Sequence, residues 1–176
     1  MTTLAPVRLV GSVRQRFGLG DYTADANALA HHRDLAATFG VEFDPAALSS
    51  SRHNSHTTMC LAVLEQLGEL AEPIDLVILA HTVPDIDVAG AAALALAHRL
   101  TGEPPAFGIG HQGVATSFTA LRIAAEYLRS GDAKRVLVLL LDQSALPYRV
   151  PARLRPLADA ATGLVLAADE SDGAGL

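Results

Sequence analysis

The chain has 176 residues and a mass of 18.3 kDa, with 50% hydrophobic and 18% charged residues, which is typical of a single globular domain. It carries 13 Lys and Arg against 19 Asp and Glu, a formal charge of −6, and so lacks the basic field that a nucleic-acid partner requires. No apolar run reaches the roughly 18 residues of a membrane-spanning helix. The N-terminus shows no signal-peptide pattern, and the single Cys60 cannot form an internal disulfide. We therefore expect a cytoplasmic protein with neither a nucleic-acid nor a membrane partner.

The first half of the chain predicts one strand, two helices and a loop between them. A short β-branched segment predicts a strand, and two segments with helical spacing of apolar residues predict helices, the first with Asp21 as a candidate N-cap and the second capped by Ser55. A polar, turn-rich segment separates the helices and predicts an exposed loop. In chain order these elements are the strand Val7–Val13, the helix Tyr22–Phe39, the loop Pro45–Asn54 and the helix His56–Leu67.

The second half alternates strands and helices. Continuous apolar runs predict strands buried on both faces, and an alanine-rich segment predicts a helix packed closely against a sheet. The elements are the strand Ile74–Ala80, the helix Val88–Leu100, the strand Ala106–Ile109, the helix Val114–Leu128, the strand Arg135–Leu141 and the strand Gly163–Ala168. This alternation predicts an α/β layer fold with a mostly parallel sheet, in one domain over residues 1–176.

A glycine-rich turn stands between the strand at Ala106 and the helix at Val114. It spells G-x-G-x-x-G over residues 108–113, which is the pattern of a dinucleotide-binding loop. The nearest acidic residue at a strand end is Asp142, 34 residues after Gly108 (142 − 108), whereas the dinucleotide fold places it about 20 residues on. We therefore favour a tight turn whose backbone N–H groups face a ligand. The candidate pocket residues are His81, Thr82, Gly110, Gln112, Gly113 and Val114, with Asp85 nearby.

Six segments together carry a family resemblance. In chain order they are Asp75–Ala80, His81–Asp85, Phe107–Gly113, Ala115–Leu128, Ser130–Val138 and Ala160–Leu166. This ordered set resembles the N-terminal half of a ketoacyl synthase III, a member of the thiolase superfamily. The resemblance implies half of a thiolase-like fold, with a mixed, mostly parallel five-stranded sheet and helices on both faces.

The resemblance also implies a nucleophilic cysteine at the start of the helix near residue 114, where the helix dipole favours a thiolate. Alignment on the helix places this position at Val114, and alignment on Phe107 places it at Gly113; neither residue can attack a thioester. Cys60 lies in an earlier apolar helix and is expected to be an inert core thiol. The remaining catalytic candidates are His111, as a general base or oxyanion donor, and Ser117, as a surrogate nucleophile.

Other family features are expected to be missing. The resemblance places a catalytic His and Asn in a C-terminal half that would follow Leu176. It also implies a coenzyme A clamp of an aromatic residue and an arginine, yet the chain has no Trp and offers only Arg52. We therefore expect no cofactor, and an acyl carrier protein in place of coenzyme A. His53 and His56 are two ligands without partners, so no metal site is expected.

The helix that begins at Val114 is apolar through its first two turns, which predicts contact with another chain. The expected interface residues are Phe107, Val114, Phe118 and Leu121. Three functions follow. The first is a non-catalytic subunit, in a homodimer or paired with a ketosynthase-like or C-terminal-half chain, in fatty-acid-like or polyketide-like biosynthesis. The second is a split acyltransferase or condensing enzyme to which His111 contributes. The third is a small-ligand or nucleotide-binding module that uses the glycine turn.

Overall fold

The sheet of this protein has the strand order β1-β5-β4-β2-β3. The structure is a computed structural model that describes residues 6–49, 52–148, 151 and 156–169. The strands are β1 (Val7–Arg16), β2 (Leu76–His81), β3 (Ala106–Ile109), β4 (Arg135–Asp142) and β5 (Ala160–Ala168). β2 is parallel to both β3 and β4, whereas β5 is antiparallel to both β4 and β1. The predicted mixed five-stranded sheet is confirmed, but it is not mostly parallel, because two of its four strand pairings are antiparallel.

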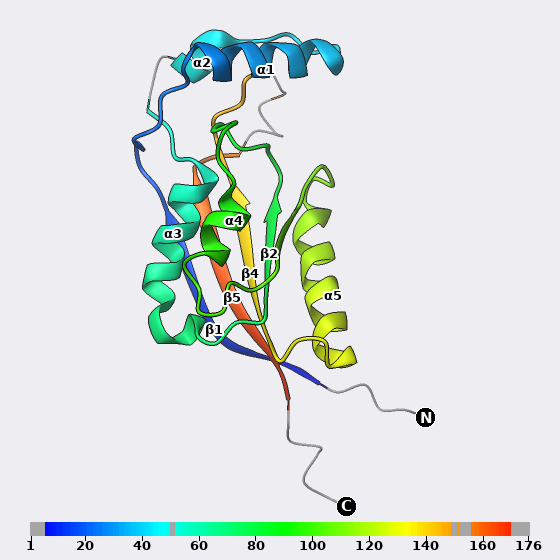
Figure 1. Cartoon of the computed structure of the whole chain (residues 1–176). Helices are drawn as coiled ribbons and strands as arrows, with labels where there is room; N and C mark the ends of the chain where they lie inside the picture. Colours follow the sequence, from blue (N-terminus) through cyan, green and yellow to red (C-terminus); the bar gives the residue numbers. More distant parts are fainter. Residues whose placement is uncertain (1–5, 50–51, 149–150, 152–155, 170–176) are drawn as a thin grey trace, which may run out of the picture.

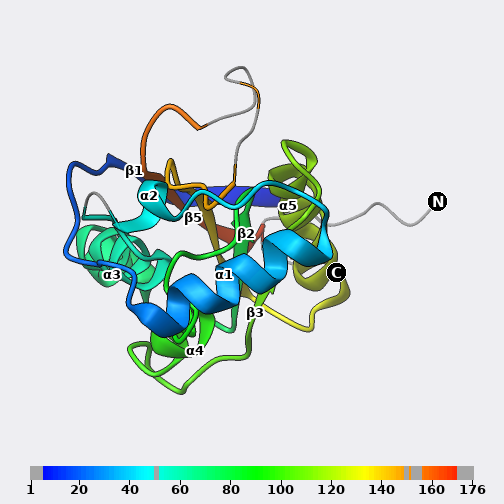
Figure 2. The same cartoon turned by 90° about the horizontal axis from the view of Figure 1, so that it is seen from above.

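Helices cover both faces of this sheet, as predicted. The helices are α1 (Ala26–Thr38), α2 (Pro45–Ser49), α3 (His56–Leu67), α4 (Ala92–Ala97) and α5 (Ala115–Ser130), with a 3-10 turn at Gly68–Ala71. α3 and α4 lie on one face of the sheet and α5 lies on the other (Figure 1). α1 crosses above one end of the sheet, as the view from above shows (Figure 2).

The alternation of side chains along β2 explains this layered arrangement. Val77 and Leu79 belong to the apolar cluster formed with α3 and α4, whereas Ile78 and Ala80 belong to the cluster formed with α5. All four side chains are at most 3% exposed. Because successive residues of a strand point to opposite faces, an uninterrupted apolar run is what a strand covered on both sides requires.

Two predictions in the first half of the chain are corrected. The segment Pro45–Asn54 is not entirely loop, because it begins with the helix α2; residues 50 and 51 of that segment lie outside the described residues. The first long helix begins at Ala26 rather than Tyr22, and its N-cap is Asp25, whose Oδ1 accepts a hydrogen bond from the N–H of Ala28 at 2.8 Å. A side-chain oxygen placed there satisfies a free N–H of the first turn.

The helix predicted over Val88–Leu100 is much shorter in the structure, where α4 spans only Ala92–Ala97. The carboxylate of Asp87 accepts hydrogen bonds from the N–H groups of Ala89 and Gly90, at 3.2 and 3.1 Å. This turn uses the N–H groups that a longer helix would have at its start, since Asp side chains compete with the backbone for such donors. β1 and β5 are longer than predicted because they pair with each other as far as Arg16 and Ala160.

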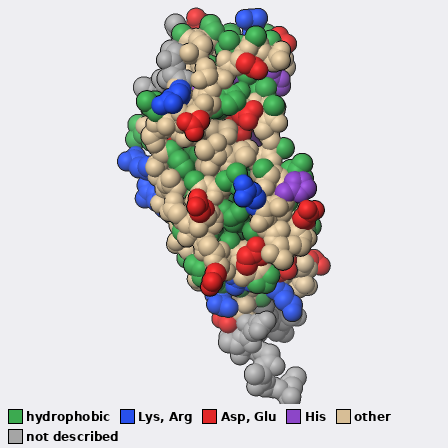
Figure 3. Space-filling view, turned by 60° about the vertical axis from the view of Figure 1, so that its left-hand side comes forward, with side chains coloured by type: hydrophobic (Ala, Val, Ile, Leu, Met, Phe, Trp, Pro, Cys, Tyr) green, Lys and Arg blue, Asp and Glu red, His purple; other side chains and the backbone are tan. Residues whose placement is uncertain are grey.

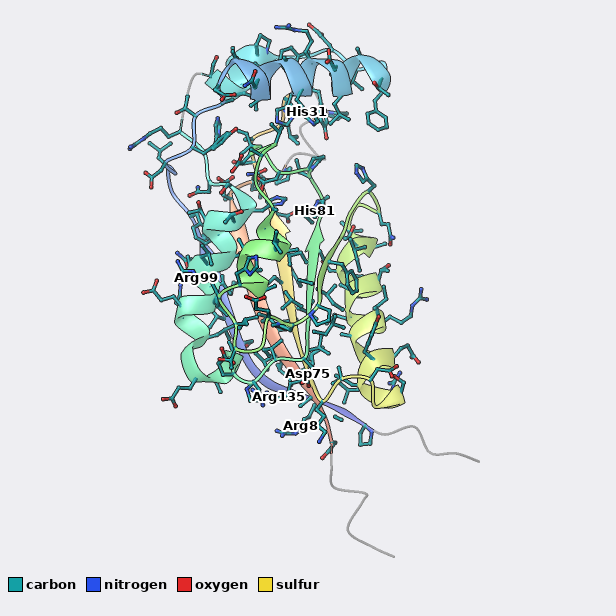
Figure 4. All side chains as sticks on the ribbon, in the orientation of Figure 1. Arg8, His31, Asp75, His81, Arg99 and Arg135 are labelled. Carbon is teal, nitrogen blue, oxygen red and sulfur yellow. The ribbon has the colours of Figure 1, made fainter. Side chains whose placement is uncertain are left out.

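The two ends of the parallel strands differ in character. His81 lies at the end of β2 nearest α1, whereas Asp75 and Arg135 lie at the opposite end (Figure 4). Asp75 Oδ2 there accepts hydrogen bonds from the N–H groups of Lys134 and Arg135, both at 2.8 Å. Charged side chains of both signs are intermixed on the face that Figure 3 brings forward. Within the described ranges, no helix is long and apolar enough to cross a bilayer.

Candidate functional site

The candidate site lies at the carboxyl ends of β2 and β3, where open α/β sheets place ligands. The turn from β3 to α5 has two residues in the left-handed region, His111 with φ 62° and Gly113 with φ 54°. The turn is closed by the Thr116 hydroxyl, which donates to the carbonyl of Gly113 at 2.8 Å. A positive φ is uncommon for a residue other than glycine, so His111 is held by this turn in a conformation that its side chain does not favour.

The ring of His81 packs against the glycine turn. A Cβ placed on Gly110 would lie 2.7 Å from Cε1 of His81, so only glycine allows the imidazole to lie there. Nδ1 of His81 lies 3.1 Å from the carbonyl oxygen of Val83. Because a carbonyl oxygen only accepts, Nδ1 carries the proton and Nε2 keeps its lone pair. Burial lowers the pKa of His81 and favours this neutral form.

A second histidine lies beside His81. The ring centroids of His56 and His81 are 5.1 Å apart, and His56 is only 3% exposed. Its backbone N–H donates to Asp85 Oδ1 at 3.0 Å, and its Nδ1 lies 3.9 Å from Asp85 Oδ2. Nε2 of His56 and Oδ2 of Asp85 are buried without a hydrogen-bond partner. Burial lowers the pKa of His56 to about 3 and raises the pKa of Asp85.

Gln143 directly follows β4, and its side-chain amide forms hydrogen bonds with the backbone next to Asp85 and His56. Its Oε1 accepts from the N–H of Ile86 at 3.1 Å, and its Nε2 donates to the carbonyl of Asn54 and to Asp85 Oδ1. The Gln143 side chain is fully buried. The loop after β2 and the start of α3 are therefore tied together through one amide, which fixes the positions of Asp85 and His56.

His56, His81 and Asp85 line a cavity of about 520 Å³. Its other walls come from residues 90–94 around the start of α4, from Pro104 and Pro105, and from Gly108. A smaller cavity of about 250 Å³ lies between α1 and the glycine turn, and His111 lines it together with Pro84 and Phe39. The two cavities therefore lie near opposite parts of the same turn, one with His81 in its wall and one with His111.

The structure brings only some of the predicted pocket residues together. His81 contacts Gly110 and shares the larger cavity with Asp85, whereas Thr82, Gln112 and Gly113 are exposed and line neither of these two cavities. The side chain of Gln112 instead accepts a hydrogen bond from the Thr119 hydroxyl at 2.6 Å.

The residues considered for the nucleophile lie at the start of α5 and in α3. Val114 precedes the first residue of α5 and is 86% exposed, Gly113 is also exposed, and Ser117 is half-buried within the first turn. Cys60 is fully buried, and burial raises the pKa of its thiol. A thiol of this kind is inert because the thiolate is the reactive form.

Sequence reasoning missed two residues of the cluster. The sequence pattern indicates for His56 only a metal-ligand role together with His53, and no sequence pattern marks Gln143. The available signal for His56 was its position directly after the N-cap Ser55, at the start of a helix whose middle, Met59–Leu64, is apolar. Within the part of the chain that the structure describes, no three His, Cys, Asp or Glu side chains gather as a metal site requires.

Comparison with known proteins gives a result at the level of structure only. No protein-family profile and no curated protein matches the sequence. A tetronic acid condensing enzyme matches 96% of the chain with 56% of its own length, at 23% identity and a TM-score of 0.57. A 3-oxoacyl-(acyl-carrier protein) synthase from Burkholderia xenovorans matches 93% of the chain with 48% of its length, at 22% identity and 0.58. A priming β-ketosynthase of a polyketide pathway matches 93% of the chain with 50% of its own length, at 18% identity and a TM-score of 0.59.

These proteins share the arrangement of strands and helices with this chain. The chain spans about half the length of the structures that it matches, and the similarity extends over nearly all of its own length. The predicted resemblance is confirmed for the fold: this chain has the fold of the N-terminal half of a ketoacyl synthase III-like, thiolase-fold enzyme.

Proposed function

We propose that this chain is a cytoplasmic ketosynthase III-like subunit that has no nucleophile of its own and pairs with a second chain in acyl-thioester biosynthesis. The observation that carries the proposal is Val114. The family resemblance puts the nucleophile at Val114 or Gly113, and the structure has an apolar side chain there, 86% exposed at the start of α5. Such a side chain cannot attack a thioester carbonyl, but it offers apolar surface to another protein. The condensing enzymes that share the fold support the fatty-acid or polyketide setting.

The pairing surface is the exposed side of α5. Phe118 lies one turn after Val114 and is 73% exposed, so the two side chains share one face of the helix. The opposite side of α5 packs on the sheet through Ala120, Ala124 and Leu128. Phe107 and Leu121, also expected at the interface, are partly buried against this same cluster. In a complex they would lie between the exposed face of α5 and the sheet and would not themselves form the centre of the interface.

The partner is either a second copy or a ketosynthase-like chain that supplies the other half of the fold, with an acyl carrier protein as the acyl donor. Two copies would be related by a twofold axis that places the same α5 face on both sides. Removal of apolar surface from water, at about 25 cal/mol per Å², favours either arrangement.

Light scattering tests the pairing. We expect the full chain to be dimeric, or to join a complex when it is co-expressed with the products of neighbouring genes, and Phe118→Asp to release a folded monomer. Leu157→Asp is the matched control, because Leu157 is 93% exposed but lies outside α5. A wild-type chain that stays monomeric at micromolar concentration under both conditions would overturn the pairing.

Mass spectrometry tests the absence of a nucleophile. We expect no acyl adduct on the intact chain after incubation with acyl thioesters of an acyl carrier protein or of coenzyme A. An adduct on any residue of this chain would overturn the non-catalytic role. Because this readout does not depend on pairing, the two parts of the proposal can fail separately.

One observation favours a second candidate, a split condensing enzyme. His111 is exposed, lines the smaller cavity and is held at a positive φ, and backbone strain of this kind concentrates at functional sites. In this case the partner chain would supply the nucleophile, and His111 would act as general base or oxyanion donor. His111→Ala would then abolish turnover of the reconstituted complex, whereas an unchanged rate would remove His111 from the mechanism.

A further inference from the structure

The segment of residues 23–41, which contains α1, is attached to the rest of the molecule by backbone contacts just beyond each of its ends. Before it, Tyr22 and His53 exchange backbone hydrogen bonds of 3.0 and 2.8 Å. After it, Phe43 forms a β-bridge with Tyr148. Between these two anchors the segment crosses above one end of the sheet (Figure 2). We call residues 23–41 the α1 segment.

One hydrogen bond connects the α1 segment to the structure beneath it. Nε2 of His32 lies 3.2 Å from the carbonyl oxygen of Ile86, and because that oxygen only accepts, Nε2 carries the proton. Within the described part of the chain, every other hydrogen bond of the α1 segment joins two of its own residues. The hydrogen bond of His32 is therefore the polar contact that holds this helix down.

The apolar contacts of α1 are small. Besides His32, its buried residues are Ala28 and Ala36, and Leu29 is only partly buried against the cluster that contains Ile86. The stabilisation from burial is proportional to the apolar area removed from water, and an alanine side chain removes little. The position of α1 therefore depends strongly on His32.

The surroundings of His32 accommodate only the neutral imidazole. The residue is 2% exposed, and its Nδ1 is buried without a hydrogen-bond partner. A proton on Nδ1 would bury both a charge and an N–H group without an acceptor, which is costly. Burial and the charge of His31, whose ring centroid lies 5.7 Å away, both lower the pKa of His32, whereas the hydrogen bond to Ile86 opposes this.

The neighbouring acidic groups do not compensate a second proton on His32. Among the described residues, His32 forms no ion pair. In the loop beneath α1, the carboxylates of Asp85 and Asp87 accept hydrogen bonds from backbone N–H groups of that loop and of α3. α2 contains no ionisable residue. The other ionisable groups on the packed elements are Asp25, His31, Arg33 and Asp34, all exposed on the α1 segment, and His111 and Tyr148 across the smaller cavity.

The α1 segment covers the smaller cavity. Leu35, Phe39 and Val41 of the segment line this cavity of about 250 Å³, together with Pro84 and His111. Movement of α1 away from the sheet would open the cavity and expose its apolar lining to water.

We propose that the α1 segment is a pH-sensitive lid over this cavity, held closed by the hydrogen bond from neutral His32 to Ile86 and released when His32 is protonated. The anchors at Tyr22 and Phe43 keep the released segment attached. The released ring takes up a proton at its ordinary pKa of about 6.5, whereas burial lowers the pKa of His32 in the closed state. The closed state is therefore favoured above that pH and is lost as the pH falls. The lid requires neither pairing through α5 nor a nucleophile, so it goes beyond the proposed function.

Amide hydrogen exchange of the full chain, resolved by residue and corrected for the intrinsic pH dependence of exchange, tests the lid. Uptake of one proton on opening makes the open state about tenfold more populated at pH 5.5 than at pH 7.5, so the amides of residues 30–38 should lose up to about tenfold in protection. The amides of residues 136–139, in the buried strand β4, report global unfolding and should exchange more slowly at both pH values. Equal exchange rates in α1 and β4 at pH 5.5, or unchanged protection of α1 between the two pH values, would each overturn the proposal.

Two variants assign the response to His32. His32→Gln keeps an N–H donor for Ile86 but cannot titrate, so the protection of α1 should no longer change between pH 7.5 and pH 5.5. His31→Gln is the matched control, because it removes the neighbouring exposed imidazole, and the response should persist. A response that is kept in His32→Gln, or lost in His31→Gln, would overturn the proposal.

If His32→Gln does not fold, the wild type measured in steps from pH 7.5 to pH 5 decides instead. The protection of α1 should be constant above about pH 6.5 and should then fall by up to about tenfold per pH unit. A protection that stays constant over the whole range, or that falls already above pH 7, would show that His32 does not control the lid.

Discussion

The imidazole of His81 lies directly on Gly110, where a Cβ would approach Cε1 to 2.7 Å. This contact joins the end of β2 to the turn that begins α5, two segments almost thirty positions apart in the sequence. The ring is also held by the carbonyl of Val83, 3.1 Å from Nδ1, and this hydrogen bond would have to break for the ring to move away. Gly110 is therefore required by packing rather than by a left-handed backbone.

Gly110→Ala should destabilise the protein because His81 would have to leave its place. We expect a loss of about 1–3 kcal/mol in the free energy of unfolding, the usual cost of overpacking, measured by urea denaturation. Gly18→Ala is the control, since a Cβ there meets nothing within 4 Å. Equal stability of the two variants would show that His81 is not held against the turn.

The stability of the protein should fall on acidification from pH 7 to pH 5. Burial lowers the pKa of His56 to about 3. Below about pH 6.5 the unfolded chain therefore binds a proton at His56 that the folded chain does not bind. Each such group costs up to about 1.4 kcal/mol per pH unit in this window. Burial also lowers the pKa of His32 and His81, which adds in the same direction, whereas the raised pKa of Asp85 opposes it.

Thermal unfolding at a series of pH values measures this effect. The variant His56→Gln should show a shallower loss of stability between pH 7 and pH 5 than the wild type, because it removes one of the contributing groups. A slope that is identical in the two proteins would contradict the burial of an uncharged His56.

Cys60 should resist thiol reagents in the folded protein. Its side chain is fully buried and burial raises its pKa, so the reactive thiolate is scarce and inaccessible. We expect no labelling by a maleimide in buffer and complete labelling in denaturant. Rapid modification of the native protein would contradict this and would make Cys60 a candidate nucleophile.

Asp159 should contribute to stability through the hydrogen bonds of its carboxylate. Burial by itself would raise its pKa, but hydrogen bonds from Asn54 and Ser144 lower it below the usual value. These bonds measure 2.9 Å from Asn54 Nδ2 and 2.7 Å from both the N–H and the hydroxyl of Ser144. Asp159→Ala should cost about 1–3 kcal/mol because one buried donor, on Asn54, and two part-buried donors, on Ser144, lose this acceptor.

Urea denaturation of Asp159→Ala beside Asp132→Ala checks this expectation. Asp132 is exposed and accepts a hydrogen bond from the Ser130 hydroxyl at 2.7 Å, so its loss should change stability far less. If the two variants unfold at the same urea concentration, Asp159 does not organise the loops that meet at Asn54 and Ser144.

The sequence patterns that predicted the fold are local, and the strands and helices that carry them were predicted well. The apolar runs of β2 and β4 and the helical spacing of α3 and α5 depend on which faces are buried, and burial leaves a periodic trace in the sequence. The errors fell where a single side chain decides a boundary. Asp25 rather than Asp21 caps α1, and Asp87 closes a turn that shortens α4.

The candidate site was predicted only in outline. His81, Asp85 and the glycine turn were expected together because strand ends meet at one edge of a parallel sheet. The role of Val114 in the proposed pairing also began as a sequence observation, since the resemblance implies a cysteine where the sequence has Val114 or Gly113. Its exposure, and that of Phe118, became known only from the structure.

By itself, the sequence determined the α/β layers, the resemblance to one half of a ketoacyl synthase III and the absence of a cysteine at Gly113 and Val114. The tertiary structure alone decided that His56 joins His81 and Asp85 around one cavity, that Gln143 holds them there, and that Gly110 makes room for the ring of His81. The physical reason is that periodicity records which side of an element is buried. Contacts between distant segments depend on distances across the folded chain, which no local pattern contains.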